Sequence, residues 1–460
     1  MELAYLWPVT AAIDEHGRLT IGGCDVAGLA QQYGTPLYLL DEATFRDACR
    51  AYVAALRAGY PGESAVHYAS KAWLNTAIAH LVANEGLGLD VVSGGELYVA
   101  LRAGFPPERI HMHGNAKPRA ELEQALAAGI GQIVVDNLDE LALLVSLTAH
   151  RSQPQPVALR LAPAIAADTH AHIQTGQATS KFGLPLAALD TAAGLLRDTP
   201  GLRLVGLHAH LGSQLFDLAP YAAAVGVLLD CAAHLRERYA LTIAEINPGG
   251  GLGVAYVSGQ EHPDVTAYAA LLGRTLAEGC ARRGLPLPRL VIEPGRSIVA
   301  RAGVALYTVI ATRPLPPSHD PGAATRFVHV DGGMGDNIRP ALYGAHYTAI
   351  LATRAHAPAE ETVHISGRYC ESGDVLLHHA HMPRAVVGDI VAVAAAGAYT
   401  LSMASTYNLV PRPAVLLVSD GTARLIQRRE TYEDLATRDV PVLLEQWHVP
   451  PHRPVPANSE

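Results

Sequence analysis

Short segments rich in Val, Ile and Leu alternate with helix-like stretches between about residues 65 and 295. Eight segments are strand-like, at residues 65–70, 88–92, 109–114, 132–136, 157–162, 204–210, 243–247 and 290–294. The clearest helix-like stretches between them are residues 117–129, 138–148, 185–198, 218–238 and 265–283. Eight strand–helix repeats predict a closed (β/α)8 barrel of the TIM type, and hence an α/β fold. A doubly wound open sheet shows the same alternation but usually has fewer strands.

The pattern changes after about residue 303. Segments such as RFVHV, TVHIS and AVLLVSD are typical of strands joined by turns, with little helix between them. We expect the strand-like residues near the N-terminus, which include RLTIGG, to complete this β domain. The predicted division is N-terminal strands (1–36), a barrel (37–303), a mostly β C-terminal domain (304–447) and a loose, Pro-rich tail (448–460).

Charge, hydropathy and cysteine content exclude several classes of protein. The formal net charge of −9 gives no electrostatic case for binding nucleic acid or an anionic membrane. No apolar run approaches the roughly 20 residues that span a bilayer, and MELAYLWPVT has no signal-peptide pattern. The five cysteines are scattered and show no CxxC spacing, which favours reduced thiols in a cytoplasmic protein and disfavours a structural zinc site.

Lysine is rare in this chain. Only Lys71, Lys117 and Lys181 occur among 34 Lys and Arg residues. An amine can lose its proton and bond covalently to an aldehyde, whereas a guanidinium stays protonated. A coding bias against lysine would also leave a few at random positions. The residues around each lysine must therefore decide between a functional lysine and one left by chance. The sequence alone gives no definite role for Lys117, which we expect to pair with a carboxylate, or for Lys181.

Unusual residues fall where the predicted barrel strands end, which is where barrel enzymes build their active sites. Lys71 follows the first strand, His208 and His210 close the sixth, PGGGLG (248–253) follows the seventh, and Glu293 closes the eighth. The HxH pair favours a zinc or iron site, because both side chains lie on one face of a strand. The glycine run is suited to a phosphate, although many such runs are only tight turns.

A pyridoxal phosphate (PLP) site accounts for more of these residues than a metal does. PLP needs an amine, a phosphate cradle, a partner for its pyridine nitrogen and a flat group against its ring. Lys71, Gly249 to Gly251, Glu293 and one of the two histidines supply these four groups. A metal hydrolase would use the histidines but would give no role to Lys71 or to the glycines.

Motifs along most of the chain resemble those of a known family. The matching motifs are HYASKAW, LDVVSGGELYVAL, HMHGNAK, TGQATSKFGLP, GLHAHLGSQ, NPGGGLG, EPGRS, DGGMGDNIRPALYGAHY, GRYCESGD and GAYTLSMASTYN, which lie between about residues 65 and 413. The chain is similar to the fold-type III, alanine-racemase-like PLP decarboxylases. RPALY and CESGD are more typical of their diaminopimelate branch, so the resemblance implies decarboxylation of meso-2,6-diaminopimelate to L-lysine, the last step of lysine biosynthesis.

The resemblance also implies residue roles. Lys71 would carry PLP, Glu293 would face the pyridine nitrogen, and His210, rather than His208, would stack on the ring. The remaining cofactor contacts would be Ser213, Gly250, Gly251, Gly295, Arg296 and Tyr399. The substrate contacts would be Arg296, Arg339, Tyr343, Glu371 and Tyr399, with the arginines suited to carboxylates.

A shared active site is implied as well. Cys370, with Lys71, would act in protonating the product, and Cys370 and Glu371 would reach into the site of a second subunit of a homodimer. Three other readings stay open. These are a PLP decarboxylase of ornithine, arginine, a D-amino acid or a carboxypolyamine, a metal-dependent barrel hydrolase, and a non-catalytic homologue.

Overall fold

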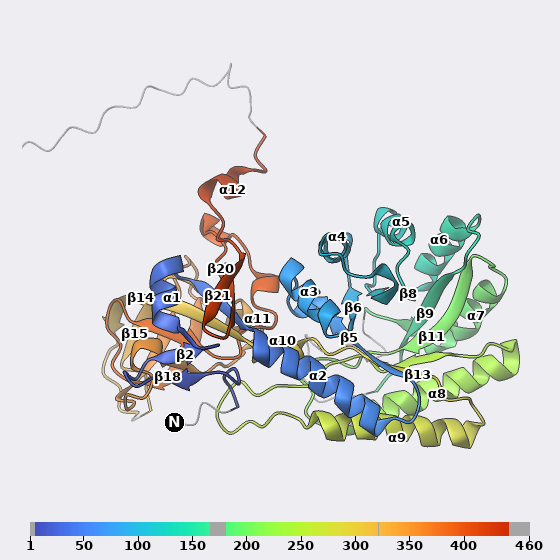
Figure 1. Ribbon diagram of the computed structural model, residues 1–460, viewed down its shortest axis with the longest axis horizontal. Helices are drawn as coiled ribbons and strands as arrows, with labels where there is room; N and C mark the ends of the chain where they lie inside the picture. The colour runs from blue at the N-terminus through green and yellow to red at the C-terminus, as the bar shows by residue number, and fades with distance from the viewer. Residues whose placement is uncertain (1–4, 166–180, 321, 441–460) are drawn as a thin grey trace, which may run out of the picture.

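The protein consists of a barrel and a β domain that lie side by side (Figure 1). The computed structural model describes residues 5–165, 181–320 and 322–440. The tail expected at 448–460 and the first part of the TGQATSKFGLP motif lie outside these residues. No helix within the described ranges is both long and apolar enough to cross a membrane.

All eight predicted strands form one closed parallel barrel, which confirms the predicted (β/α)8 fold. The barrel runs in the order β9-β11-β12-β13-β5-β6-β7-β8, and pairing of β8 with β9 closes it. The strands are β5 (Ser64–Ala69), β6 (Gly88–Val91), β7 (Ile110–Met112), β8 (Gln132–Val135), β9 (Gln155–Ala162), β11 (Leu202–His208), β12 (Glu245–Asn247) and β13 (Arg289–Ile292). A short strand, β10 (Leu184–Pro185), pairs with β9 outside the closed ring.

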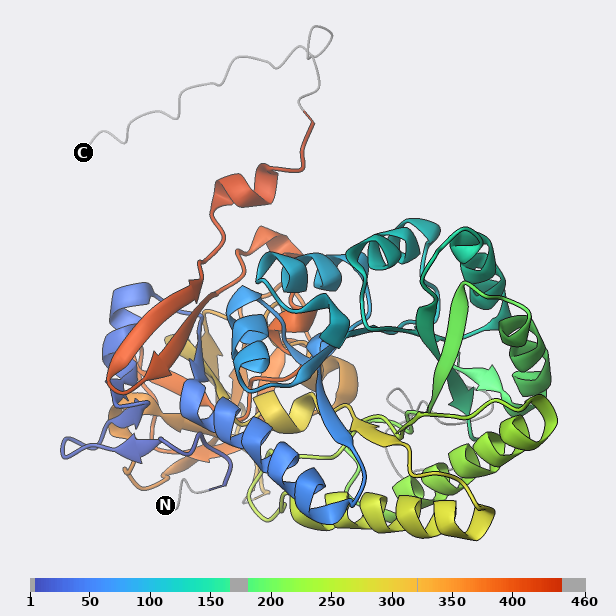
Figure 2. The ribbon, with the colours of Figure 1, turned by 45° about the vertical axis from the view of Figure 1, so that its right-hand side comes forward.

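Helices surround the strands on the outside of the barrel (Figure 2). They are α2 (Glu42–Gly59), α3 (Thr76–Asn84), α4 (Gly94–Arg102), α5 (Arg119–Ala128), α6 (Leu138–Thr148), α7 (Leu189–Arg197), α8 (Ala219–Tyr239) and α9 (Val265–Arg283). Asp41, Asn75, Ser93, Asn137 and Asp264 cap α2, α3, α4, α6 and α9, accepting hydrogen bonds from first-turn N–H groups.

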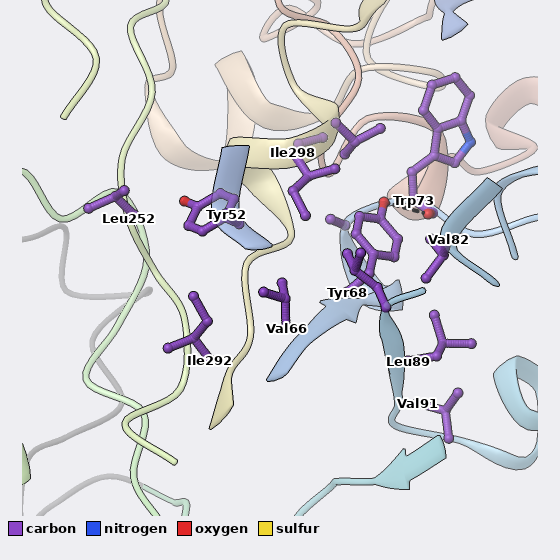
Figure 3. Packing of buried hydrophobic residues seen from close by; sticks show 14 of the residues in the cluster. Tyr52, Val66, Tyr68, Trp73, Val82, Leu89, Val91, Leu252, Ile292 and Ile298 are labelled. Atoms are coloured by element: carbon purple, nitrogen blue, oxygen red, sulfur yellow. Dashed lines mark hydrogen bonds between the residues drawn. The ribbon is translucent and has the colours of Figure 1, made fainter. Parts of the chain in front are cut away.

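Apolar side chains fill the space between the strands and the helices. Figure 3 shows Val66 of β5 and Ile292 of β13 near Tyr52 of α2. The Tyr52 hydroxyl lies 2.6 Å from the Ser297 hydroxyl. This contact joins α2 to the segment that follows the last barrel strand, and so helps to fix one edge of the active site.

The barrel strands and their carboxyl ends bury many polar side chains. A barrel interior is usually filled with branched aliphatic residues. Here the buried polar residues are His67, Asp90, His111, His113, Gln132, Asp136, Arg160, His208, Glu245, Asn247 and Glu293. Burying polar groups is costly unless they are hydrogen-bonded or paired. Five of them, Asp90, His113, Arg160, His208 and Glu293, line one cavity at the carboxyl ends of the strands.

The β domain is built on a mixed sheet. Its main path is β18-β17-β15-β14-β4-β20-β21, and β19 pairs with both β14 and β16. Its strands are β4 (Leu37–Asp41), β14 (Gly303–Pro314), β15 (Arg326–Val330), β16 (Ala349–Leu351), β17 (Glu361–Ser366), β18 (Val375–Met382), β19 (Ile390–Val393), β20 (Ala414–Ser419) and β21 (Thr422–Gln427). Short helices α10 (Arg296–Val299), α11 (Arg339–Tyr343) and α12 (Tyr432–Ala436) complete the chain.

The N-terminal boundary differs from the predicted one. β1 (Ala12–Ile13), β2 (Leu19–Ile21) and β3 (Cys24–Asp25) form a sheet of their own, followed by α1 (Val26–Tyr33). The strand that enters the large sheet is β4, inside the range assigned to the barrel. Its side chains alternate between two apolar cores, with Leu37 and Leu39 in one and Tyr38 and Leu40 in the other. This two-sided burial makes β4 a central strand of the β domain.

Candidate active site

A cavity of about 330 Å³ opens at the carboxyl ends of the barrel strands. It is lined by Ala69, Ser70, Lys71, Asp90, Val92, His113, Gly114, Asn115, Arg160, Phe182, His208, His210 and Glu293. The structure therefore brings together Lys71, both histidines and Glu293, which the sequence placed on three different strand ends.

Lys71 lies in a short 3-10 helix, η1 (Ser70–Ala72), directly after β5. The backbone around it is held on both sides. The Ala69 N–H donates to the Pro294 carbonyl at 3.2 Å, and the Ala72 carbonyl accepts from the Tyr399 N–H at 2.9 Å. Trp73 is buried against Tyr68, whose hydroxyl donates to the Trp73 carbonyl (Figure 3). These contacts fix the backbone from which the amine enters the cavity.

Glu293 is buried among partners from three other strands or strand ends. Its Oε1 accepts from Asn247 Nδ2 at 2.6 Å and lies 3.2 Å from His113 Nε2. Its Oε2 lies 3.2 Å from His208 Nε2. Burial acts to raise the pKa of this carboxyl, but the charges of His113 and His208 outweigh it and hold the pKa well below its usual range. Glu293 is therefore an anion in the barrel interior.

Two histidines that line the cavity, His113 and His210, differ in pKa. Burial lowers the pKa of His113, but the negative charges of Glu293 and Asp90 outweigh this effect and raise it to about 9. Burial, reinforced by the charge of Lys71, holds the pKa of His210 well below 6.5. His210 is thus a neutral ring at the cavity wall, which suits packing against a flat ligand.

The glycine run lies close to neighbouring backbone. A Cβ on Gly250 would meet the Glu293 carbonyl oxygen at 1.9 Å, and one on Gly251 would meet the Gly212 carbonyl at 2.1 Å. Gly251 also has φ +108, which L side chains rarely adopt. The Gly250 N–H donates to His210 Nδ1 at 3.3 Å. Only glycine allows this approach, which packs the loop against His210 and the Glu293 backbone.

Ser213, Arg296 and Tyr399 form a cluster beside this loop. Arg296 Nη2 and Nε donate to the Ser213 hydroxyl at 2.9 and 3.2 Å. The guanidinium carbon lies 4.8 Å from the Tyr399 ring centre. Gly295 precedes Arg296 and packs against Ala69, where a Cβ would lie 3.0 Å from the Ala69 Cβ. A buried cation, a hydroxyl and a glycine loop are suited to a phosphate.

Arg339 and Tyr343 begin and end α11 in the β domain. Arg339 is buried and donates to the Tyr347 hydroxyl. Its guanidinium carbon lies 4.6 Å from the Tyr256 ring centre, and Arg296 also contacts Tyr256. Arg339 is thereby connected to the Arg296 cluster. Tyr343 is partly buried on the same helix.

Cys370 and Glu371 are exposed and do not line the cavity of their own chain. The Cys370 N–H donates to Asn408 Oδ1 at 2.9 Å, and the Cys370 carbonyl accepts from the Tyr407 hydroxyl at 3.2 Å. Hydrogen bonds therefore hold this part of the loop in place at the surface of the β domain.

Among the described residues, His208 and His210 do not belong to one common group of potential metal ligands, as the alternative HxH metal site would require. His113, His208 and Glu293 offer ligand atoms within 4.8 Å of one another, a spacing that could hold a metal ion. Within the described part of the chain, His210 is not a member of this group. The presence of Lys71 and His210 in the same cavity instead fits PLP, for which the glycine loop and the Ser213–Arg296 cluster supply a phosphate site.

Several residues of the site were not predicted. Arg160 lies over the Phe182 ring at 4.5 Å, and Asp90, Asn115 and His113 also border the cavity. The charge of Arg160 in the middle of an apolar strand was a usable signal. The prediction for Lys117 is confirmed, because its Nζ lies 2.7 Å from Glu140 Oε1. Lys181 lies 5.0 Å from the Phe182 ring centre.

Comparison with known proteins identifies relatives along almost the whole chain. Residues 42–300 match the family model for the pyridoxal binding domain of pyridoxal-dependent decarboxylases. The diaminopimelate decarboxylase of Bacillus subtilis is 43% identical over 435 residues, which cover 94% of this chain and 97% of that protein. The Mycobacterium tuberculosis enzyme of the same name (strain H37Rv) is 42% identical and covers 95% and 98%.

Solved structures agree with the sequence relatives. A diaminopimelate decarboxylase from M. jannaschii in complex with L-lysine superposes with a TM-score of 0.86 at 34% identity, covering 94% of this chain and 98% of that one. A Helicobacter pylori diaminopimelate decarboxylase complexed with L-lysine gives a TM-score of 0.79 at 33% identity, covering 89% and 98%.

Proposed function

The chain belongs to the diaminopimelate decarboxylases, a branch of the pyridoxal-dependent decarboxylases, and we propose that it converts meso-2,6-diaminopimelate to L-lysine and carbon dioxide. One observation carries the proposal. Lys71, His210 and Glu293 face the same cavity at the carboxyl ends of the barrel strands. The reaction would complete lysine biosynthesis.

The residues present fit PLP as the cofactor. When bound, PLP supplies a ring that accepts the electron pair left by the departing carbon dioxide. The Lys71 amine would hold its aldehyde carbon, and the anionic Glu293 would keep a proton on the pyridine nitrogen. The neutral His210 would lie against the ring. Gly250, Gly251, Gly295, Ser213, Arg296 and Tyr399 would surround the phosphate.

The substrate carries two carboxylates and two amines, and two arginines are available to bind it. Neither Arg296 nor Arg339 has a described carboxylate within 4.0 Å, although both are buried. An uncompensated buried cation favours an anionic ligand. We assign Arg339 and Tyr343, with Arg296 and Tyr399, to the distal L-amino-acid end of the substrate, which does not lose its carboxylate.

A homodimer would complete the site. Cys370 and Glu371 are exposed on a loop away from their own cavity, so we place them in the site of a second copy. There Glu371 would bind the distal ammonium group, and Cys370, with Lys71, would deliver the proton that replaces the lost carboxylate. The five unpaired cysteines are also consistent with a reducing compartment, and we place the enzyme in the cytoplasm.

The absorption spectrum of the purified protein tests the proposed function. We expect a visible band after reconstitution with PLP, and release of carbon dioxide and L-lysine in equal amounts when meso-diaminopimelate is added. Lys71→Ala should lose both the band and turnover, because no other described lysine borders the cavity. Substantial decarboxylation by that variant would remove Lys71 from its role. Faster release from ornithine or arginine would reassign the substrate.

A further inference from the structure

Tyr256 lies between the two buried arginines of the site. It belongs to the loop after β12 and is 5% exposed. Arg296, from the barrel side, donates from Nη1 to the Tyr256 hydroxyl at 2.7 Å. Arg339, from the β domain, places its guanidinium carbon 4.6 Å from the centre of the same ring. One side chain thus contacts cations from both parts of the molecule.

The two arginines need such a neighbour. Both are buried, and neither forms an ion pair with a carboxylate among the described residues. Their polar and aromatic partners are instead Ser213, Tyr256, Tyr347 and Tyr399. Like charges in a poorly hydrated interior repel one another. An aromatic face and a hydroxyl oxygen attract cations without adding a full negative charge that would compete with an anionic ligand.

The electrostatics of Tyr256 agree with this position. Burial raises the pKa of its hydroxyl, but the charges of Arg296 and Arg339 outweigh that effect and lower it below 10. The hydroxyl oxygen therefore lies in a positive environment created by both arginines.

Tyr256 is itself held from both sides. Its N–H donates to Gln260 Oε1 at 2.9 Å within the loop. Its carbonyl accepts from the Thr348 hydroxyl of the β domain at 3.0 Å. Its ring meets the Tyr347 ring edge-on at 5.3 Å. The backbone and the ring are therefore fixed relative to the barrel and to the β domain.

We propose that Tyr256 is a positioning residue that holds Arg296 for the cofactor phosphate and Arg339 for the substrate carboxylate at a fixed separation. This inference rests on the proposed function, because it assigns the two anions that the arginines bind. Tyr256 acts on the reaction only through the two arginines.

Two mild substitutions test the contacts of Arg296 and Arg339 separately. Tyr256→Phe removes the hydroxyl partner of Arg296 and keeps the ring beside Arg339. We expect the Kd for PLP, measured by titrating cofactor-free enzyme, to rise about tenfold, and KM to rise by less than the Kd does, because Arg339 keeps both the ring of residue 256 and its Tyr347 partner. Tyr347→Phe removes the hydroxyl partner of Arg339, and should raise KM about tenfold while leaving the Kd for PLP within about twofold.

Tyr256→Leu removes both contacts and should raise both constants. Tyr268→Phe is the matched control, since Tyr268 is equally buried and its hydroxyl has no partner in the described structure. It should leave both constants unchanged. A general loss of stability cannot produce opposite patterns in Tyr256→Phe and Tyr347→Phe. If Tyr256→Leu keeps both constants near wild type, the inference is wrong, whereas wild-type protein that binds no PLP refutes the proposed function itself.

Discussion

At the scale of single residues, the three lysines differ by their surroundings. Lys71 faces the cavity, whereas Lys117 is enclosed, with its Nζ within 2.8 Å of Glu140 Oε1 and of the Gly114 and Val134 carbonyls. Burial lowers the pKa of Lys117 and raises that of Glu140, although each offsets part of the other's shift. Lys117 therefore ties the loop after β7 to β8 and α6, and its role is structural.

Removing one partner of this pair should be costly. Lys117→Met leaves the Glu140 carboxylate buried and unpaired, and we expect the free energy of unfolding to fall by about 3–5 kcal/mol in urea titrations. The double variant with Glu140→Met should recover most of this loss. Arg119→Met is the control, because the Arg119–Glu123 pair is exposed and contributes less than about 1 kcal/mol. Equal effects of the two single variants would contradict a structural role for the Lys117–Glu140 pair.

At the scale of elements, the glycine loop after β12 can be tested separately from the charged residues. Gly250 has a φ outside the left-handed region, so the obstacle to a side chain is space alone. Gly250→Ala should push the loop away from the Glu293 carbonyl, destabilise the fold by about 1–3 kcal/mol, and weaken PLP binding about tenfold or more.

Gly226→Ala provides the control for that substitution. Gly226 lies within α8, where an added Cβ meets no atom within 4 Å. Alanine is the better helix former, so this variant should gain up to about 1 kcal/mol in stability and bind PLP normally. Normal PLP binding by Gly250→Ala would show that the close approach of this loop is not required for the cofactor.

Comparison of the predicted and observed elements shows how much of the fold and of the site the sequence could predict. All eight barrel strands were predicted, because each is a short apolar run bounded by Gly, Pro or polar residues. Lys71, the histidine pair and Glu293 were placed together because parallel strands bring their carboxyl ends to one rim. The choice of His210 over His208 came only from the family resemblance. β4 was assigned to the barrel but belongs to the β domain, since its apolar pattern fits a barrel strand equally well. Tyr256 could not be found, because its role depends on arginines 40 and 83 residues away that only the tertiary fold brings together.

At the scale of the whole molecule, the cavity and the Cys370 loop belong to different parts of one chain. If a second copy supplies the loop, neither copy has a complete site alone. Each active site would then use Lys71 and Glu293 from one subunit and Cys370 from the other. A homodimer with twofold symmetry would create two equal sites of this kind.

Mixed dimers test this arrangement. Lys71→Ala and Cys370→Ala homodimers should each be nearly inactive, but a mixed dimer would contain one site with both native residues. Random association of equal amounts should therefore restore about a quarter of wild-type turnover per site. Mixing Lys71→Ala with Glu293→Gln is the matched control. Both of those residues come from the same chain in any one site, so no mixed dimer has an intact site and activity should stay low. Recovery in the control, or none in the first mixture, would contradict a shared active site.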